Sequence, residues 1–266
     1  MDLGLRGKAC AVTGASSGIG RETARKLCAE DADVLLVARS EEQLAEAAEE
    51  CEREGGRAAA LTLDVTAEDA GERIVAEATE RFGQLDVLVN NAGAAQRRDL
   101  DDVPDEDWYA AFEINVMAPL RVMRTAVPPM AERGWGRIVN ISSSAGKRPS
   151  ATTPEYSVAK AAELSLSRLF ADRYAKRGVL VNAICPGPVA SEMWMAPGGL
   201  LDQTTKLSGA GSREEALKAF EEQRPIGRLG EVDEIASAIV FLCSENASYV
   251  SGSAWSVDGG TVQIII

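Results

Sequence analysis

A tyrosine, a lysine and a serine in the middle of the chain have the spacing to act together in proton transfer. Tyr156 and Lys160 are four residues apart in the stretch NISSSAGKRPSATTPEYSVAK at 140–160, and side chains four apart share one face of a helix. Ser143 stands at the end of the preceding apolar run, from which its hydroxyl can reach the same place. A phenol, an ammonium and a hydroxyl are thereby brought together.

These three groups favour acid–base chemistry by the tyrosine. A free tyrosine has a pKa of about 10 and exchanges protons poorly at neutral pH, but a neighbouring ammonium favours the phenolate and lowers that pKa. The chain contains no histidine, so the usual base at neutral pH is missing. A tyrosine–lysine pair is also common on ordinary helix surfaces, so the other elements must decide whether this pair does chemistry.

A strand, a loop and a helix position the three groups. GRIVNISS at 136–143 is a short apolar run that ends in hydroxyls. Pro154 suits the first turn of a helix, where no N–H donor is needed, and this helix continues to about Gly178. The groups therefore meet at the carboxyl end of a strand, where open α/β sheets bind their ligands.

A glycine-rich turn near the N-terminus predicts a phosphate-binding site. TGASSGIG at 13–20 lies between the apolar run KACAVT at 8–13 and the helical stretch RETARKLCAE at 21–30. Glycine permits a tight turn and close approach of the backbone to a phosphate, and the following helix offers free N–H groups and the positive end of its dipole. A plain strand-to-helix turn is the alternative, which this context disfavours.

The end of the second strand indicates which dinucleotide binds. ADVLLVA at 32–38 is followed by Arg39, in the region where dinucleotide-binding proteins contact the adenosine ribose. A carboxylate there would bind the 2′-hydroxyl of NAD, whereas the planar guanidinium of arginine suits a 2′-phosphate. Ala38 and Arg39 therefore favour NADP(H) over NAD, with a solvated arginine as the alternative.

Strands and helices alternate along most of the chain. Further apolar runs occur at 57–65, 84–93, 136–143, 179–187 and 253–260. They are nearly continuous in apolar residues, as in parallel strands covered on both faces. Helical stretches separate them, for example at 40–56, which has a serine cap and closing glycines. The alternation predicts an α/β fold of Rossmann type, a single dinucleotide-binding and catalytic domain over 1–266 with a doubly wound parallel sheet of about seven strands.

Residues 104–133 interrupt the alternation with two successive helical stretches. The second should kink or break at Pro128-Pro129. Asn115 lies between apolar neighbours in this region, so its amide needs a hydrogen-bond partner in the local backbone or in a functional site.

Residues 188–228 form an insertion that is typical of a binding loop or lid. It holds an apolar, glycine- and proline-containing stretch around Trp194, then a polar stretch and a short helix. The apolar side chains suggest an apolar substrate. At the other end of the chain, the apolar ending TVQIII predicts burial against another subunit.

Composition excludes several classes of function. The chain of 266 residues has a formal net charge of −13, which argues against nucleic acid as a partner because phosphate contacts need a basic face. It has no apolar run long enough to span a membrane and no signal-peptide pattern. The five cysteines are widely spaced, which predicts reduced, mostly buried thiols in a cytoplasmic protein, and without histidine no metal site is expected.

Six motifs occur in one order across nearly the whole chain, and together they resemble the short-chain dehydrogenase/reductase family. They are TGASSGIG at 13–20, NNAG at 90–93, Asn115, Ser143, Tyr156-x-x-x-Lys160 and PGPV at 186–189. The interval of 13 residues from Ser143 to Tyr156 also fits. The resemblance implies hydride transfer between a nicotinamide and a ketone or secondary alcohol.

The resemblance also implies roles for the central residues. Tyr156 would give a proton to the carbonyl oxygen in reduction and remove it in oxidation. Lys160 would lower the tyrosine pKa and hold the nicotinamide ribose, and Ser143 would hydrogen-bond the substrate oxygen. Asn115 would hold a water that links Lys160 to solvent.

The cofactor-binding residues that the resemblance implies follow the dinucleotide from one end to the other. Besides Tyr156 and Lys160 they are Gly14, Ser16, Ser17, Gly18, Ile19 and Gly20 at the pyrophosphate, Arg39 at the 2′-phosphate, Asp64 and Val65 at the adenine, Asn90, Asn91, Ala92 and Gly93 beside the adenosine, and Pro186, Gly187, Val189 and Ser191 toward the carboxamide.

Within the family the chain looks most like the 3-oxoacyl-[acyl-carrier-protein] reductase branch, for example over residues 224–260. Where carrier-protein reductases present arginines on two interface helices, however, this chain has Pro128-Pro129 and Asp172. An acidic carrier would also be repelled by the net charge. We therefore expect a small or medium ketone or secondary alcohol as substrate.

Two other functions remain open at this point. An NAD-dependent alcohol or polyol dehydrogenase is disfavoured by Arg39, and a nucleotide-sensing regulator without catalysis is disfavoured by the presence of both Tyr156 and Lys160. Members of the family are commonly tetramers or dimers with helices like those at 105–133 and 154–178 between subunits, so we expect a homotetramer or homodimer and no membrane partner.

Overall fold

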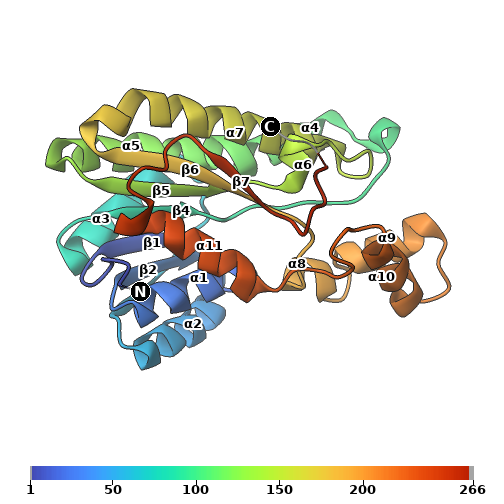
Figure 1. Cartoon of the computed structure of the whole chain (residues 1–266), viewed down its shortest axis with the longest axis horizontal. Helices are drawn as coiled ribbons and strands as arrows, with labels where there is room; N and C mark the ends of the chain where they lie inside the picture. The colour runs from blue at the N-terminus through green and yellow to red at the C-terminus, as the bar shows by residue number, and fades with distance from the viewer. Residues whose placement is uncertain (1, 264–266) are drawn as a thin grey trace.

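The computed structural model describes residues 2–263, and a seven-stranded sheet runs through its centre (Figure 1). The strand order is β3-β2-β1-β4-β5-β6-β7, and all neighbouring strands are parallel. In chain order the strands are β1 (Ala9–Thr13), β2 (Asp33–Ala38), β3 (Ala58–Thr62), β4 (Val87–Asn90), β5 (Gly136–Ile141), β6 (Val179–Pro186) and β7 (Ala254–Val257). The predicted Rossmann-type sheet is confirmed.

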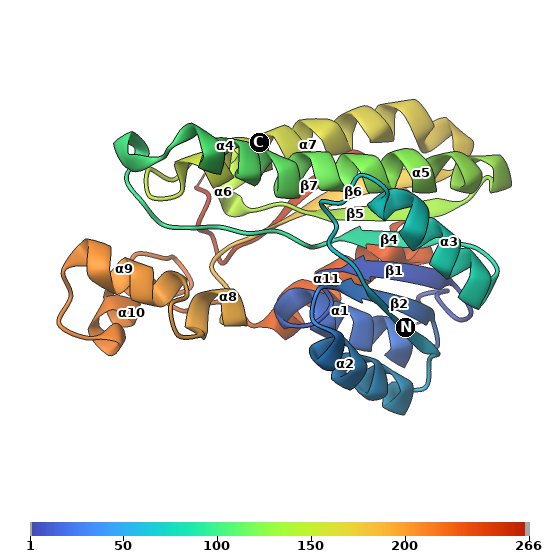
Figure 2. The ribbon, with the colours of Figure 1, turned by 180° about the vertical axis from the view of Figure 1, so that it is seen from behind.

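Helices cover both faces of the sheet, as Figures 1 and 2 show. One face carries α1 (Gly18–Ala29), α2 (Glu41–Glu54) and α11 (Val232–Cys243), and the other carries α3 (Ala70–Phe82), α5 (Ala118–Arg133) and α7 (Pro154–Tyr174). Shorter helices are α4 (Asp105–Phe112), α6 (Ser144–Lys147), α8 (Glu192–Met195), α9 (Leu200–Ser208) and α10 (Arg213–Glu222).

The strands are apolar on both sides because each side faces a separate core. In β2, Leu36 packs into the cluster beneath α1, α2 and α11, whereas Leu35 and Val37 pack into the cluster beneath α3, α5 and α7. The central strands β1, β4 and β5 are buried along their whole length, and the edge strands β3 and β7 only in part. This burial explains why the strands appear in the sequence as continuous apolar runs.

The strand order reverses between β1 and β4, because β1 pairs with β2 on one side and with β4 on the other. At such a reversal the connections leave toward opposite faces of the sheet and open a crevice beyond the carboxyl ends of the strands. The glycine-rich turn after β1 and the residues that follow β4, β5 and β6 all come to this crevice.

Two helices occupy 104–133 as predicted, but the second does not break at Pro128-Pro129, where we expected a kink or a break. The interruption is a π-helical turn at Glu113–Met117, which contains Asn115, and α5 continues through Pro128 and Pro129 to Arg133. Pro128 is exposed and Pro129 half-buried, so the carbonyls that lose their N–H partners lie on the solvent side. The opposite side of α5 packs in the core through residues such as Val127 and Met130, which holds the helix together.

The insertion after β6 is helical rather than irregular. Its polar stretch forms α9, and α8, α9 and α10 build a small lobe that stands beyond the end of the sheet (Figure 2). The lobe has its own apolar cluster, which includes Trp194, Leu201 and Phe220. A single β-bridge between Val189 and Gly230 closes its base.

The cysteines, the possible membrane spans and the possible metal sites can be compared with the expectations from the sequence. All five cysteines are free and buried, which agrees with the prediction. Among the described helices none is long and apolar enough to cross a membrane, and residues 2–263 contain no group of three or more acidic or cysteine side chains placed to hold a metal ion. The last residues of the TVQIII ending, 264–266, lie outside the described residues.

Candidate active site

A cavity of about 720 Å³ lies beyond the carboxyl ends of the strands. Its walls come from the glycine-rich turn, the ends of β2 to β6, the start of α7 and the lobe. Of the predicted site residues it is lined by Gly14, Ser16, Ser17, Gly18, Ile19, Arg39, Asp64, Val65, Asn91, Ala92, Gly93, Ser143, Tyr156, Lys160, Pro186, Gly187, Val189 and Ser191. Gly20, Asn90 and Asn115 lie behind this wall.

The glycine-rich turn has the geometry of an anion site. Gly14 and Gly18 have positive φ angles of 66° and 54°, which favour glycine because other residues are strained there. Ser17 caps α1 without a side-chain hydrogen bond to it, so the first N–H groups of α1 remain available at the cavity wall. Free N–H groups and the positive end of the helix dipole together suit a pyrophosphate.

Gly20 packs the turn rather than lining the cavity. A Cβ atom at this position would lie 2.3 Å from the carbonyl oxygen of Gly14 and 2.4 Å from Nδ2 of Asn91. The same Asn91 amide donates hydrogen bonds to the carbonyls of Thr13 and Gly14, at 3.0 and 3.1 Å. Gly20 therefore acts on the turn through close packing.

Asn90 was predicted beside the adenosine, but its side chain lies against Asn140 of β5 on the sheet face that α5 covers. Its Nδ2 donates to Oδ1 of Asn140 at 2.7 Å, and both side chains are buried. Because side chains alternate along a strand, Asn90 and Asn91 face opposite ways at the end of β4. This orientation removes Asn90 from the cavity and leaves Asn91 at its wall.

The adenosine end of the cavity carries an exposed cation. Arg39 follows β2 and lies at the cavity wall without an ion-pair partner among the described residues. Asp64, across from it, has a lowered pKa, because the backbone and hydroxyl of Thr66 hydrogen-bond its carboxylate and Arg39 adds a weaker attraction. Arg39 is therefore free to meet an anion from outside the protein.

Tyr156, Ser143 and Lys160 converge as their spacing predicts. Ser143 lies near enough to the phenol to act on its pKa, and the Lys160 ammonium lies 5.8 Å from the centre of the tyrosine ring. We expected Lys160 to lower the tyrosine pKa. Burial is the larger effect and raises the pKa of Tyr156 overall, while Lys160 and Ser143 act in the lowering direction.

Lys160 has a buried acidic partner that the motifs did not indicate. Its Nζ donates to Oε2 of Glu163 at 3.0 Å and to the carbonyl of Ile141 at 2.7 Å. Burial alone would lower the pKa of Lys160, but Glu163 and Tyr156 raise it, and the net direction is upward. Burial raises the pKa of Glu163 to about 7 against the attraction of Lys160. The i, i+3 spacing on α7 was a signal that could have found this pair.

In the part of the chain that the structure describes, the side-chain oxygen of Asn115 is an unpaired hydrogen-bond acceptor that lies near Lys160. The Nδ2 of Asn115 donates to the carbonyl of Ala111 at 2.9 Å, which is a local backbone bond within the helix. Its Oδ1 is buried and has no partner among the described residues. A Cβ atom on Gly93 would lie 2.9 Å from this Oδ1 and 3.6 Å from Nζ of Lys160, so both polar groups face the same small space. A water molecule there would satisfy the orphaned oxygen.

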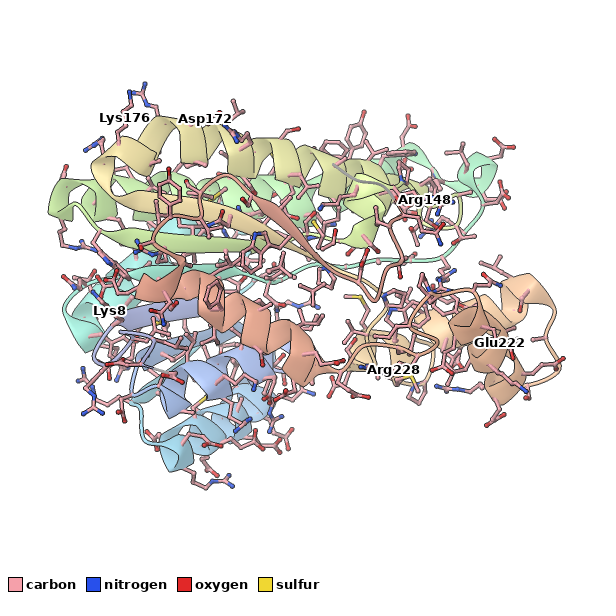
Figure 3. All side chains as sticks on the ribbon, viewed as in Figure 1. Lys8, Arg148, Asp172, Lys176, Glu222 and Arg228 are labelled. Atoms are coloured by element: carbon pink, nitrogen blue, oxygen red, sulfur yellow. The ribbon has the colours of Figure 1, made fainter. Side chains whose placement is uncertain are left out.

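The substrate end of the cavity lies between the lobe and the segment that precedes α7. Trp194 and Phe220 pack against each other there, with ring centres 4.7 Å apart. Arg97 and Arg224, which the sequence did not single out, also line this end. Figure 3 marks Arg148 beyond α6 and Glu222 at the end of α10, on the two parts of the chain that face each other across this end of the molecule.

Comparison with known protein families gives a match over nearly the whole chain. The profile described as "Enoyl-(Acyl carrier protein) reductase" matches residues 14–262. An uncharacterized oxidoreductase of Thermotoga maritima is 38% identical over 262 residues, which cover 98% of this chain and 100% of the relative. A 3-oxoacyl-[acyl-carrier-protein] reductase of the same organism is 34% identical, covering 97% of this chain and 99% of the relative.

Solved structures give the same result. The structure of L-sorbose reductase from Gluconobacter frateurii, complexed with NADPH and L-sorbose, superimposes with a TM-score of 0.92 at 34% identity and full coverage of both chains.

Proposed function

Because the chain belongs to the short-chain dehydrogenase/reductase family, we propose that it is an NADPH-dependent reductase of a small or medium ketone, which oxidises the matching secondary alcohol in reverse. The observation that carries this proposal is the convergence of Tyr156, Ser143 and Lys160 at one end of a cavity whose other end has a phosphate-type glycine turn. Hydride transfer between a nicotinamide and a carbonyl group is the reaction of this family.

The preference for NADPH rests on Arg39. Its guanidinium is exposed at the adenosine end of the cavity and has no acidic partner in the described part of the chain. No carboxylate follows β2 to accept a hydrogen bond from a ribose 2′-hydroxyl, because Ala38 and Arg39 occupy that place. The 2′-phosphate of NADPH would supply the negatively charged partner that Arg39 lacks within the described residues.

The residues around the cavity suit the two parts of the cofactor. The turn from Gly14 to Ile19 and the start of α1 would hold the pyrophosphate, and Val189 and Ser191 would meet the carboxamide. When bound, the nicotinamide supplies the hydride. Lys160 would hold the nicotinamide ribose, a role that is supported by its position at the cavity wall beside Tyr156.

Tyr156 gives the proton. Its phenol and the hydroxyl of Ser143 both donate hydrogen bonds to the carbonyl oxygen, and this polarises the carbonyl for attack. As the carbonyl carbon accepts hydride, the oxygen takes the phenolic proton and becomes the alcohol. A raised tyrosine pKa keeps the phenol protonated at neutral pH, which favours the reductive direction.

Lys160 and Asn115 restore the proton. The ammonium stabilises the phenolate that the reaction leaves behind, because the two charges are opposite and the ammonium is buried. A water between Lys160 and the orphaned Oδ1 of Asn115 then connects the site to solvent. This arrangement completes the proton path without a histidine.

The test is a cofactor assay with a matched inactive variant. Purified protein is mixed with NADPH or NADH and a panel of ketones and 3-oxoacyl thioesters, and oxidation of the cofactor is followed by absorbance. We expect turnover with NADPH and a loss of about 10²-fold or more in Tyr156→Phe. NADPH binding without turnover on any substrate of the panel would contradict the proposal and favour a nucleotide-sensing role. Faster turnover with NADH would favour the NAD-dependent dehydrogenase instead.

We also propose that the protein is a cytoplasmic homotetramer or homodimer. Exposed apolar side chains gather on α4 and α7, namely Tyr109, Val158 and Leu169, and these helices contact each other on one side of the molecule (Figure 1). Such a face favours burial against a second copy. Light scattering after size exclusion should give a mass of two or four chains, and Leu169→Asp should lower it. A monomer at micromolar concentration would contradict this.

A further inference from the structure

Two arginines face the substrate end of the cavity from different segments of the chain. Arg97 lies in the connection between β4 and α4, four residues after Gly93, and Arg224 follows the end of α10. Both line the cavity that also contains Ser143 and Tyr156. The two guanidiniums are near enough for the charge of Arg97 to lower the pKa of Arg224, which burial already lowers.

Neither arginine has an acidic partner among residues 2–263, although the chain has 41 acidic residues. Other arginines in this part of the molecule are paired: Arg98 with Asp107, Arg213 with Asp202, and Arg228 with Glu234. The Nε atoms of Arg97 and Arg224 are both buried without a hydrogen-bond partner. Two half-buried cations with unsatisfied donors are costly unless an anion joins them.

The surroundings hold both guanidiniums in place. Arg97 lies over the rings of Trp194 and Phe220, at 5.2 and 5.3 Å from their centres, and its Nη1 donates to Oγ1 of Thr152 at 3.0 Å. Arg224 lies over the same Phe220 ring and donates to the carbonyl of Phe220. Aromatic faces fix the planes of the cations without using their N–H groups. Most of the donors of each guanidinium therefore remain for a ligand.

The arginines belong to the substrate part of the cavity rather than to the phosphate turn. Thr152, the partner of Arg97, precedes Tyr156 by four residues on the segment that leads into α7. The backbone N–H of Arg97 also donates to Oε1 of Gln203 in α9, at 2.7 Å, which ties the lobe to the same segment. A molecule that reaches Tyr156 with one end can meet the two guanidiniums with the other.

We infer that the substrate is an anionic ketone, whose carboxylate or phosphate group is bound jointly by Arg97 and Arg224 while its carbonyl oxygen meets Ser143 and Tyr156. This inference rests on the proposed ketone reduction and names its substrate class. Carboxylate and phosphate groups each present a pair of oxygen atoms that can accept two parallel hydrogen bonds from one guanidinium. The aromatic cluster, which suggested an apolar substrate in the sequence, acts as the support of the cations.

The experiment compares charged and neutral forms of the same ketones. The panel holds oxoalkanoates with the carboxylate two to five carbons from the ketone, the methyl ester of each, and ketones that carry a phosphate monoester, all assayed with NADPH. For at least one chain length we expect kcat/KM of the acid to exceed that of its ester by about tenfold or more, since a hydrogen-bonded charge pair is worth this much. A preference for the phosphate ketones identifies phosphate as the anion.

Two variants test the arginines directly. Arg97→Gln and Arg224→Gln should each lower kcat/KM for the anionic ketone about tenfold or more, mainly through KM, while activity on the ester stays within about threefold. Arg228→Gln is the matched control, because that arginine, which Figure 3 labels, is exposed, paired with Glu234 and not among the residues that line the cavity. It should change neither value.

The outcomes separate this inference from the proposed function. Equal use of acids and esters, or an equal loss on both in the arginine variants, would overturn the inference and assign the arginines to holding the lobe against Thr152. Turnover of esters in that case would leave ketone reduction intact. No turnover of any ketone would overturn the proposed function itself. Binding of the acid to the NADPH complex of Tyr156→Phe, measured by calorimetry and lost with Arg224→Gln, would then still support the anion site.

Discussion

The ammonium of Lys160 lies 3.0 Å from the carboxylate of Glu163, and both side chains are almost fully buried. The pair lies directly behind Tyr156, so the charge of Glu163 reaches the tyrosine as well and raises its pKa. A negative charge next to Lys160 thus offsets part of the stabilisation that the ammonium gives to a phenolate. The groups that act on Glu163 or feel its charge are Lys160 and Tyr156 from α7, the hydroxyl of Ser142 after β5 and the thiol of Cys185 from β6.

Replacing Glu163 by glutamine should make the tyrosine more acidic. Without the carboxylate, Lys160 acts on the phenol unopposed, so the pKa of Tyr156 falls. In alcohol oxidation, which needs the phenolate, the pH at which kcat/KM reaches half its maximum should therefore move to lower pH by about one unit. The measurement is the pH profile of kcat/KM for oxidation by wild type and Glu163→Gln. Glu222→Gln, at an exposed site on α10, serves as the control, and identical profiles for all three proteins would contradict the prediction.

Glu163 also predicts how stability depends on pH. Its pKa is raised from 4.5 to about 7 in the folded protein, so the folded state binds more protons than the unfolded state between these values. The contribution of Glu163 is therefore most favourable below pH 4.5 and is lost as the pH rises through about 7, which amounts to about 3 kcal/mol of unfolding free energy. Denaturant unfolding of wild type and Glu163→Gln at several pH values should show wild type losing stability relative to the variant over this interval. A constant difference would be inconsistent with a buried, titrating carboxyl.

The sequence predicted the elements whose signal is local. The apolar runs of β1, β2 and β4 to β6, the capped helix α2 and the glycine turn after β1 all depend on residues within one short stretch. The four-residue spacing of Tyr156 and Lys160 correctly predicted a shared helix face, because both residues lie on α7. These features follow from the periods of helices and strands and from turn chemistry.

The features that the sequence missed depend on residues far apart in the chain. Arg97 and Arg224 come together only because the lobe folds back over the segment before α7. The continuity of α5 through Pro128 depends on core contacts made by its other face, which outweigh the local preference of proline to end a helix. The expectation that Asn90 lies beside the adenosine failed because of side-chain direction. Asn90 and Asn91 are neighbours in the motif but face opposite ways.

An added methyl group at Gly20 should damage both the turn and cofactor binding. A Cβ atom there would lie 2.3 Å from the carbonyl oxygen of Gly14, so Gly20→Ala must displace the turn, and we expect a loss of about 2 kcal/mol in stability and weaker NADPH binding. Thermal unfolding and fluorescence titration with NADPH measure the two effects. Gly230→Ala is the matched control, because the nearest atom to its added Cβ is 3.7 Å away. Unchanged NADPH binding in Gly20→Ala would show that the turn tolerates the displacement.

Removing the guanidinium of Arg39 should change the choice of cofactor. If Arg39 binds the 2′-phosphate, Arg39→Ala loses a charge-assisted contact that NADPH has and NADH lacks, so kcat/KM for NADPH should fall about 10- to 100-fold while the value for NADH stays within about twofold. Because both cofactors are assayed on one variant, the NADH value controls for any damage to the fold. Rising ionic strength should weaken NADPH binding in wild type more than in Arg39→Ala. Arg39 is exposed, so salt would screen its attraction for the 2′-phosphate. An equal loss for both cofactors would place Arg39 outside phosphate recognition and leave the preference for NADPH to be sought among its neighbours at the cavity wall, Ser40 and Gln43.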